Sequence, residues 1–440
     1  MNKEINKVDN FLDLQNFDSF LKIRRKEASW LREKRKISYC KLKGAKVPSK
    51  KVENWKYTDL KNLSSIPFIL HNKNEDKFKY NYSDFLINSK NPRIVFRNGK
   101  FDKESSNLGV LNSDLYFASI SETILNYPEL LENHINVEDS PEDDFFSFLN
   151  SAYFLDGFVL VIKKNLRLNF PIEVIFLGEA LVDSICINSF SLIIAEEGSE
   201  VNIVEKHFSN SPLPLWSNSI VKLHIKKSAN VKHFKHQSEH LNSYHISKII
   251  SFIEDNGYYE SFILSTGSRL SRNTVISNLN GVNASSLVNS IYLIKENQHS
   301  DLTTSIKHNA PYSKSSQNIF GVVEESSNGV FQGKINVKKN AQKVDASQLS
   351  RGLLLSDSSQ INYKPELEIY ADDVKCSHGS TIGELDEDQL FYLRSRGVDK
   401  MVARQILIAG FINEALNNIF DESIRDYFFS SADKWIVNNL

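Results

Sequence analysis

Short apolar runs of strand length alternate with polar corners through about residues 156–375. The corners centre near residues 198, 228 and 257, so the pattern repeats about every 30 residues. A repeat of this length is typical of stacked units, and units made only of strands fit a parallel β-helix, whose coils bury their inward faces against one another. A β-sandwich also has many short strands, but about 220 residues is long for one sandwich and hairpin Asn-Gly or Asp-Gly pairs are few. We therefore predict the β-helix, with the sandwich as the alternative.

Helical patterns flank the repeat on both sides. We predict a mostly helical N-terminal domain over residues 1–155, a β-helix core over 156–376 and a helical C-terminal domain over 377–440. In the last domain, Gly397 has the position of a residue that ends one helix, and Asp399 that of the cap that begins the next. The predicted class is therefore mainly β with helical ends.

Composition excludes several classes of protein. The 440 residues include 53 basic and 54 acidic side chains, and this balance argues against a nucleic-acid-binding protein. The cysteines, Cys40, Cys186 and Cys376, are too few for a disulfide framework or a four-thiolate cluster. No segment approaches the ~20 apolar residues that cross a bilayer, and the N-terminus lacks the order of a signal peptide. We expect a cytoplasmic protein that does not enter a membrane.

The near-neutral total conceals a charge gradient along the chain. Residues 22–51 hold 13 Lys and Arg against two Glu, whereas residues 366–396 hold eight acids against three bases. We interpret the basic stretch as a solvated helical face, with a surface for an anionic partner as the alternative.

Cys376 and His378 are the most informative pair of potential ligands. If they lie on one strand, their spacing of two places both side chains on one face, about 7 Å apart. Thiolate and imidazole are good ligands for iron or zinc, but two ligands do not close a site. The remaining ligands would have to come from elsewhere, including another chain. The alternative is a small buried cysteine beside a surface histidine.

A second histidine group has spacings of three to nine residues: His224, His233, His236, His240 and His245. On strands, His233 and His236 would face opposite ways, so we interpret the group as solvated strand positions rather than a metal site. The sequence also lacks a phosphate-binding loop, a nucleophile elbow and a His-Glu-x-x-His motif. The adjacent carboxylates Asp372 and Asp373 would suit a β-helix enzyme acting on polysaccharide, although neighbours on a strand face opposite sides.

Two blocks resemble the SufB/SufD family. Residues 365–397 (PELEIYADDVKCSHGSTIGELDEDQLFYLRSRG) are similar to the C-terminal signature of that family, in the Cys-Ser-His form of its SufD branch. Near the N-terminus, Pro48 and residues 53–60 (ENWKYTDL) resemble a motif typical of the same branch. The resemblance covers essentially the whole chain.

The resemblance implies a non-catalytic scaffold subunit with a right-handed parallel β-helix. Such a subunit pairs with a SufB-like chain through the end of the β-helix, and each helical C-terminal domain binds a SufC-like ABC ATPase. The complex assembles iron–sulfur clusters, and reduced flavin is linked to the family as a further cofactor.

The resemblance also implies roles for single residues. It places His378, and less strongly Cys376, at the interface site for the cluster. Asp372 and Asp373 are expected at a partner interface, and Arg394, Arg396 and Gly397 at the ATPase contact. The alternatives are a secreted-type polysaccharide-active β-helix enzyme and a homo-oligomeric structural β-helix.

Overall fold

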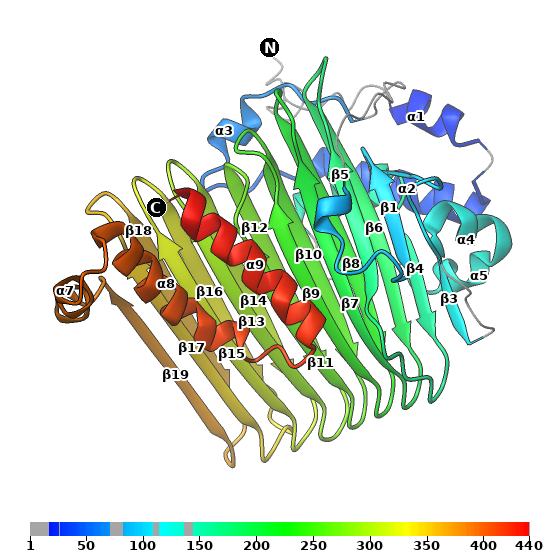
Figure 1. Cartoon of the computed structure of the whole chain (residues 1–440). Helices are drawn as coiled ribbons and strands as arrows, with labels where there is room; N and C mark the ends of the chain where they lie inside the picture. The colour runs from blue at the N-terminus through cyan, green and yellow to red at the C-terminus, as the bar shows by residue number, and fades with distance from the viewer. Residues whose placement is uncertain (1–16, 26, 71–81, 109–113, 136–143, 440) are drawn as a thin grey trace, which may run out of the picture.

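The structure is a computed structural model, and it describes residues 17–25, 27–70, 82–108, 114–135 and 144–439 (Figure 1). The described helices are α1 (Phe17–Ile23), α2 (Ser29–Gly44), α3 (Lys61–Ser64), α4 (Ile120–Asn126), α5 (Pro128–Glu132), α6 (Phe145–Tyr153), α7 (Glu387–Ser395), α8 (Lys400–Leu416) and α9 (Glu422–Asn439), with 3₁₀ turns at Glu53–Trp55 and Ser83–Phe85. None of these helices is both long and apolar enough to cross a membrane.

The described strands form two sheets. A ten-stranded sheet has the order β19-β17-β15-β13-β11-β9-β7-β5-β1-β2, and a nine-stranded sheet has the order β18-β16-β14-β12-β10-β8-β6-β4-β3. The strands are β1 (Arg93–Arg97), β2 (Lys100–Phe101), β3 (Leu115–Ser119), β4 (Phe158–Ile162), β5 (Ile172–Gly178), β6 (Ile185–Ala195), β7 (Glu200–Ser209), β8 (Leu215–Ile225), β9 (Asn230–Ser238), β10 (Tyr244–Ile253), β11 (Tyr258–Ser265), β12 (Leu270–Leu279), β13 (Ser285–Ile294), β14 (His299–His308), β15 (Lys314–Val323), β16 (Asn328–Val337), β17 (Asp345–Leu354), β18 (Gln360–Ile369) and β19 (Lys375–Gly383).

From β4 to β19 the chain alternates between the sheets, with two strands in each coil and thus eight coils. Each strand pairs in parallel with the strand of the next coil, as β10 does with both β8 and β12. The predicted β-helix is confirmed and the sandwich is excluded, because a sandwich is built from antiparallel strands.

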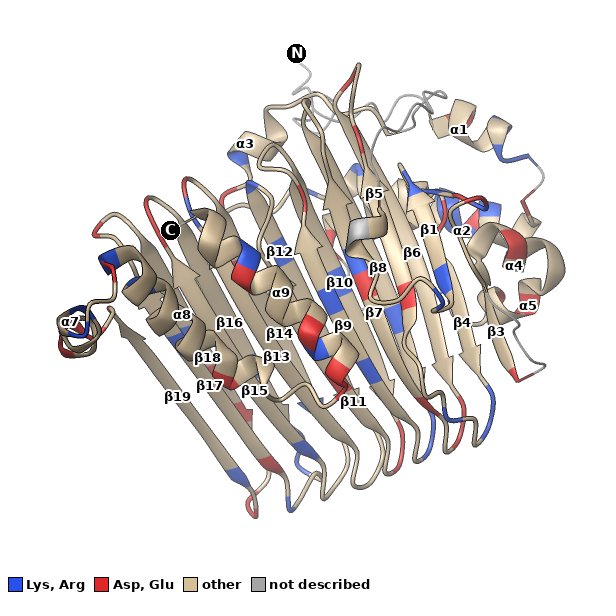
Figure 2. Cartoon of the chain, viewed as in Figure 1, with Lys and Arg blue, Asp and Glu red and all other residues tan. Residues whose placement is uncertain are grey.

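The predicted corners share one backbone conformation. Gly198, Ser228 and Asn256 have φ angles of 69°, 55° and 53°, the left-handed conformation that turns the chain sharply. The corners also stack, since the amide of Ser228 donates to the carbonyl of Asp255 and that of Asn256 donates to Val282. Charged residues gather at the corners and on the helices (Figure 2). Some strands of the middle coils also carry them, such as Glu205 and Lys206 on β7 and Lys235 on β9.

Both faces of the strands are covered in the middle of the solenoid. Inward side chains such as Ile203, Leu223 and Ile263 form an apolar core between the two sheets. The outer face of the ten-stranded sheet is covered by α8 and α9, whose Ile412 and Phe428 pack against strand residues (Figure 1). The N-terminal helices and α6 cover the first coils of the nine-stranded sheet.

The basic stretch is solvated with one exception. The described Lys and Arg side chains of residues 22–51 are exposed or half-buried, apart from Arg35. Arg35 Nε donates to Glu27 Oε2 at 2.9 Å, and its guanidinium lies 4.0 Å from the centre of the Phe154 ring. Burial lowers the pKa of Arg35 to about 10 although Glu27 opposes this effect. The interpretation of a solvated face was therefore wrong at Arg35, which anchors α2 to the body.

The last coil is open. Most residues of the earlier strands are buried, but every residue of β18 and β19 is exposed or half-buried. These two strands are also the ends of their sheets, so each has one edge without a strand partner in the described chain. Unpaired edges of this kind are a template for pairing with another chain.

Candidate functional site

Cys376 and His378 both lie on β19, the strand that ends the ten-stranded sheet. In the register of the sheet, Cys376 pairs with Ala346 and His378 with Gln348, and both of these partners are buried. The two side chains therefore share the face that continues the solenoid interior, where no further coil follows. Cys376 is half-buried and His378 is exposed. The predicted strand and shared face are confirmed.

The surroundings of this pair contain further polar groups. Burial and the nearby carboxylate of Asp345 raise the pKa of the Cys376 thiol, so that a metal would have to displace its proton. One coil deeper, Gln348 is 2% exposed, and both atoms of its amide lack a hydrogen-bond partner among the described residues. Buried amides normally have hydrogen-bond partners. The Gln348 amide is next to His378 in the register of the sheet, so its unpartnered atoms lie beside the proposed ligand.

The other predicted interface residues lie at two nearby places. Asp372 and Asp373 are exposed in the turn between β18 and β19, where Asp373 forms an ion pair with Lys343. Arg394 lines a groove of about 800 Å³ between α7 and the solenoid. Arg396 caps the C-terminal end of α7, and Gly397 follows with a φ of +86°.

The apolar side chains of α7 are only partly buried. Leu390 is buried, but Phe391 is 74% exposed and Tyr392 is 58% exposed. On the next helix, Met401 and Ile406 are 55% and 48% exposed. This part of the chain therefore presents an apolar surface that nothing in the described chain covers.

The second histidine group differs in part from the prediction of solvated positions: His233, His236 and His245 are buried and His224 is half-buried, whereas His240 is exposed as predicted. His233 and His236 face opposite ways as expected, but both are buried, because the interior covers one and α9 covers the other. His236 Nδ1 shares a 2.8 Å hydrogen bond with the hydroxyl of Tyr427, and burial lowers the pKa of His236 to about 3. His224 Nε2 lies 3.1 Å from His134 Nδ1. His240 lies in the corner between β9 and β10.

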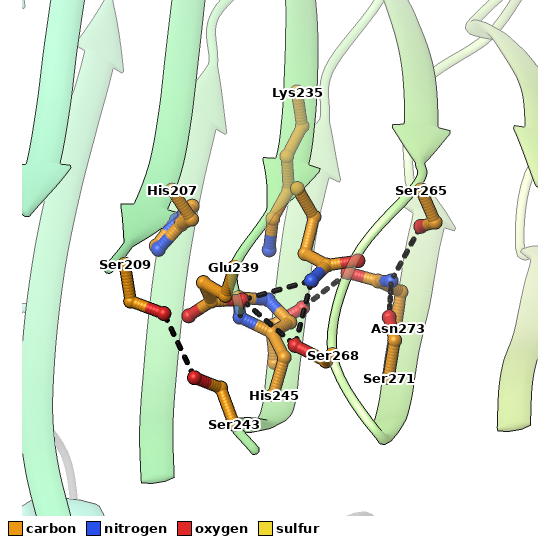
Figure 3. Close-up of polar contacts among 12 residues, drawn as sticks. His207, Ser209, Lys235, Glu239, Ser243, His245, Ser265, Ser268, Ser271 and Asn273 are labelled. Carbon is orange, nitrogen blue, oxygen red and sulfur yellow. Dashed lines mark hydrogen bonds and ion pairs between the residues drawn. The ribbon is translucent and has the colours of Figure 1, made fainter. Parts of the chain in front are cut away.

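His245 belongs to a buried cluster that the sequence analysis missed. It lies with His207 and Glu239 inside the solenoid, and one ligand atom from each residue is within 4.8 Å of the others (Figure 3). Burial by itself would raise the pKa of the Glu239 carboxyl. The nearby His245 and His207 together have the larger effect and lower this pKa to about 2. Burial also lowers the pKa of His245 to about 4. The repeat was a signal for only one of its pairs, because His207 and Glu239 are about one coil apart, whereas His245 follows Glu239 by six residues and lies on a strand of the other sheet.

A further inward histidine allows a test of how the polar interior responds to pH. His308 is enclosed by the hydroxyls of Ser313 at 2.7 Å and Ser315 at 2.9 Å, and burial lowers its pKa to about 4. The unfolded chain takes up this proton near pH 6.5, so stability falls as the pH drops from about 6.5 to about 4. We expect His308→Gln to remove on the order of 3 kcal/mol of this pH dependence. Urea unfolding midpoints of the native chain and of His308→Gln between about pH 6.5 and 4 measure this difference. If the midpoint fell equally with pH in both, His308 would not be the source of the pH dependence.

Comparison with known proteins identifies the family. A model described as "SUF system FeS cluster assembly, SufBD core domain" matches residues 182–411, more than half of the chain. A second, described as "SufBD protein N-terminal region", matches residues 6–174. The chain belongs to the SufBD family. The first match includes the whole of β19, and so SufBD membership covers the strand that carries Cys376 and His378.

Relatives in the SufBD family match over most of their length. The chain is 31% identical over 401 residues to an iron-sulfur cluster assembly SufBD family protein of Synechocystis sp., covering 89% of this chain and 88% of that protein. It is 30% identical to protein ABCI7, chloroplastic, of Arabidopsis thaliana, covering 86% and 80%. It is 27% identical to the iron-sulfur cluster assembly protein SufD of Escherichia coli, covering 86% and 87%. Membership in a cluster-assembly family counts against a polysaccharide-active enzyme.

Proposed function

We propose that this chain is the SufD-like scaffold subunit of a SufB–SufC₂–SufD complex and contributes ligands to an interface site where iron–sulfur clusters are built. The Cys-Ser-His form of residues 376–378 and the likeness to SufD of Escherichia coli support the SufD-like assignment. The scaffold itself is not catalytic, and ATP hydrolysis belongs to the SufC-like partner. We assign no flavin-binding residue within the described part of this chain.

The observation that carries the proposal is the open last coil. β19 offers one unpaired edge and a half-complete ligand set, Cys376 and His378, on a face that another coil would cover. A SufB-like chain with its own solenoid end could pair there and supply the missing ligands. The nascent cluster is the cargo of this site rather than a resident group of either chain.

The C-terminal helices α7–α9 are the proposed ATPase-docking region. They lie in the last of three proposed domains, residues 1–155, 156–376 and 377–440, but β19 (Lys375–Gly383) crosses the second boundary and belongs to the solenoid. The exposed apolar side chains of α7 and α8, together with Arg394, Arg396 and Gly397, suit a partner helix or groove. Aromatic and arginine side chains are the residue types enriched at the centres of interfaces. We place the assembled complex in the cytoplasm.

Mixing the chain with SufB-like and SufC-like chains tests the partnership. We expect light scattering of the isolated complex to give one SufB, one of this chain and two SufC. Ile382 is 45% exposed on the same face of β19 as His378, and Ile382→Lys should weaken SufB binding at least about tenfold, which is about 1.4 kcal/mol. Ile23→Lys is the control, because Ile23 is 64% exposed on α1, among the N-terminal helices. Failure to form any hetero-complex would favour the homo-oligomeric structural β-helix.

A further inference from the structure

We propose that His207, Glu239 and His245 bind one divalent transition-metal ion, such as Zn²⁺ or Fe²⁺, inside the solenoid. The three residues come from β7, from the corner after β9 and from β10. Two imidazoles and a carboxylate are a common ligand set for zinc and for non-haem ferrous iron. The cluster is six strands from β19 along the ten-stranded sheet, which is about 30 Å, so it is separate from the proposed interface site.

The geometry of the cluster is that of groups around a common centre. Figure 3 shows the three side chains converging from neighbouring segments. Their ligand atoms lie within 4.8 Å of one another. Tetrahedral zinc with bonds of about 2.0–2.1 Å holds its ligand atoms about 3.3 Å apart, so binding would draw the widest pair together by up to about 1.5 Å. A cavity of about 20 Å³, lined in part by His207 and Glu239, provides the space of one water molecule.

The pairing of His245 with Glu239 is incomplete. His245 Nδ1 lies 2.9 Å from Glu239 Oε2, but neither ring nitrogen has an aligned hydrogen-bond partner among the described residues. His245 is 0% exposed, so water does not readily supply the missing bond. Lone pairs of metal ligands point toward the ion rather than toward each other, which accounts for a short contact without hydrogen-bond alignment.

His207 is oriented by a neighbouring carboxylate. Its Nε2 lies 2.5 Å from Glu205 Oε1, and Glu205 Oε2 in turn contacts His233 Nε2 at 3.0 Å. A neutral imidazole that donates from Nε2 presents the lone pair of Nδ1. A carboxylate behind a ligating histidine is the usual arrangement around metal sites, because it fixes the tautomer and raises the basicity of the ring.

The local charge also favours a cation. The inward side chains of β7, β9 and the following corner include two carboxylates, Glu205 and Glu239, and one amine, Lys235. Lys235 Nζ lies 3.9 Å from Glu205 and has no hydrogen-bond partner among the described residues. Lys235 interacts with both carboxylates, so these three inward charges sum to −1, and a buried net charge is costly unless something such as a cation compensates it.

Metal content of the full-length chain tests the site. The chain is produced with added Zn²⁺ or Co²⁺, since a buried site fills during folding, and weakly held ions are removed with a chelator. We expect about one equivalent of metal per chain. Glu239→Gln and His245→Gln should each lose it, whereas His308→Gln, another buried inward histidine without a carboxylate beside it, should retain it.

Three results would overturn the site: a native chain with no more metal than Glu239→Gln, equal retention by the cluster variants, or equal loss by His308→Gln. Circular dichroism shows whether each variant is folded. X-ray absorption of the metal-loaded native chain needs no variant, and it should show only nitrogen and oxygen ligands at about 2.0–2.1 Å. A sulfur shell at about 2.3 Å would instead place the ion on a cysteine and refute the assignment.

Discussion

His378→Ala is expected to abolish cluster assembly by the complex while SufB-like and SufC-like chains still co-purify. The imidazole is exposed on β19, so its truncation removes a ligand without opening a cavity in the core. Loss of a group that merely orients a ligand lowers metal affinity by about 10–100-fold. We therefore expect loss of the ligand itself to lower cluster yield at least about tenfold. Iron and acid-labile sulfide in the anaerobically purified complex measure that yield.

Two neighbouring substitutions make the His378 result specific. Ser377→Ala alters the exposed residue between Cys376 and His378, whose side chain lies on the opposite face of the strand, and should leave the yield unchanged. Cys376→Ser should have a smaller effect than His378→Ala, since Cys376 is half-buried against apolar side chains. Normal cluster yield in His378→Ala would refute the site assignment, even if the complex forms as proposed.

Arg272→Met is expected to destabilise the chain by about 3–5 kcal/mol, the usual cost of leaving one member of a buried ion pair unpaired. Arg272 is 2% exposed and forms an ion pair with Asp301, which also accepts a hydrogen bond from Thr58. Its guanidinium lies 3.9 Å from the centre of the Trp55 ring and donates to the carbonyl of Asn54 at 2.8 Å. One side chain thus holds the segment around residues 54–58 against the outer face of the nine-stranded sheet.

The measurement is the urea concentration at the unfolding midpoint of the full-length chain. Lys226→Met is the matched control, because Lys226 forms a 2.8 Å ion pair with Glu254 at an exposed corner. Exposed pairs contribute about 0–1 kcal/mol, so its midpoint should change little. Equal shifts in the two variants would show that burial of the Arg272 pair has no special role.

Local features of the fold were predictable because they depend on neighbours in sequence. Asp399 caps α8 by accepting a 2.8 Å hydrogen bond from the amide of Met401, as its position before an apolar helix predicts. The corners at Gly198 and Ser228 were visible as polar breaks in apolar runs. The repeat of about 30 residues then implies stacked coils, because a strand pair of that length can bury its inward face only on a neighbouring pair.

The burial of the histidines was not predictable from the same patterns. Alternation of polar and apolar residues marks a strand with one solvated face, but here helices cover the outer face and the core fills the inner one. His233 and His236 therefore look alike in sequence, although one lies beside Glu205 in the interior and the other beside Tyr427 of α9.

The sequence by itself determined the coil repeat, the helical ends, the caps and the shared face of Cys376 and His378, since each follows from spacing along one segment. Only the tertiary structure showed that β19 is the uncovered end of the solenoid and that His207, Glu239 and His245 meet inside it. The physical reason is that both depend on how coils stack. Stacking decides which residues of separate coils become neighbours and which strand keeps a free edge.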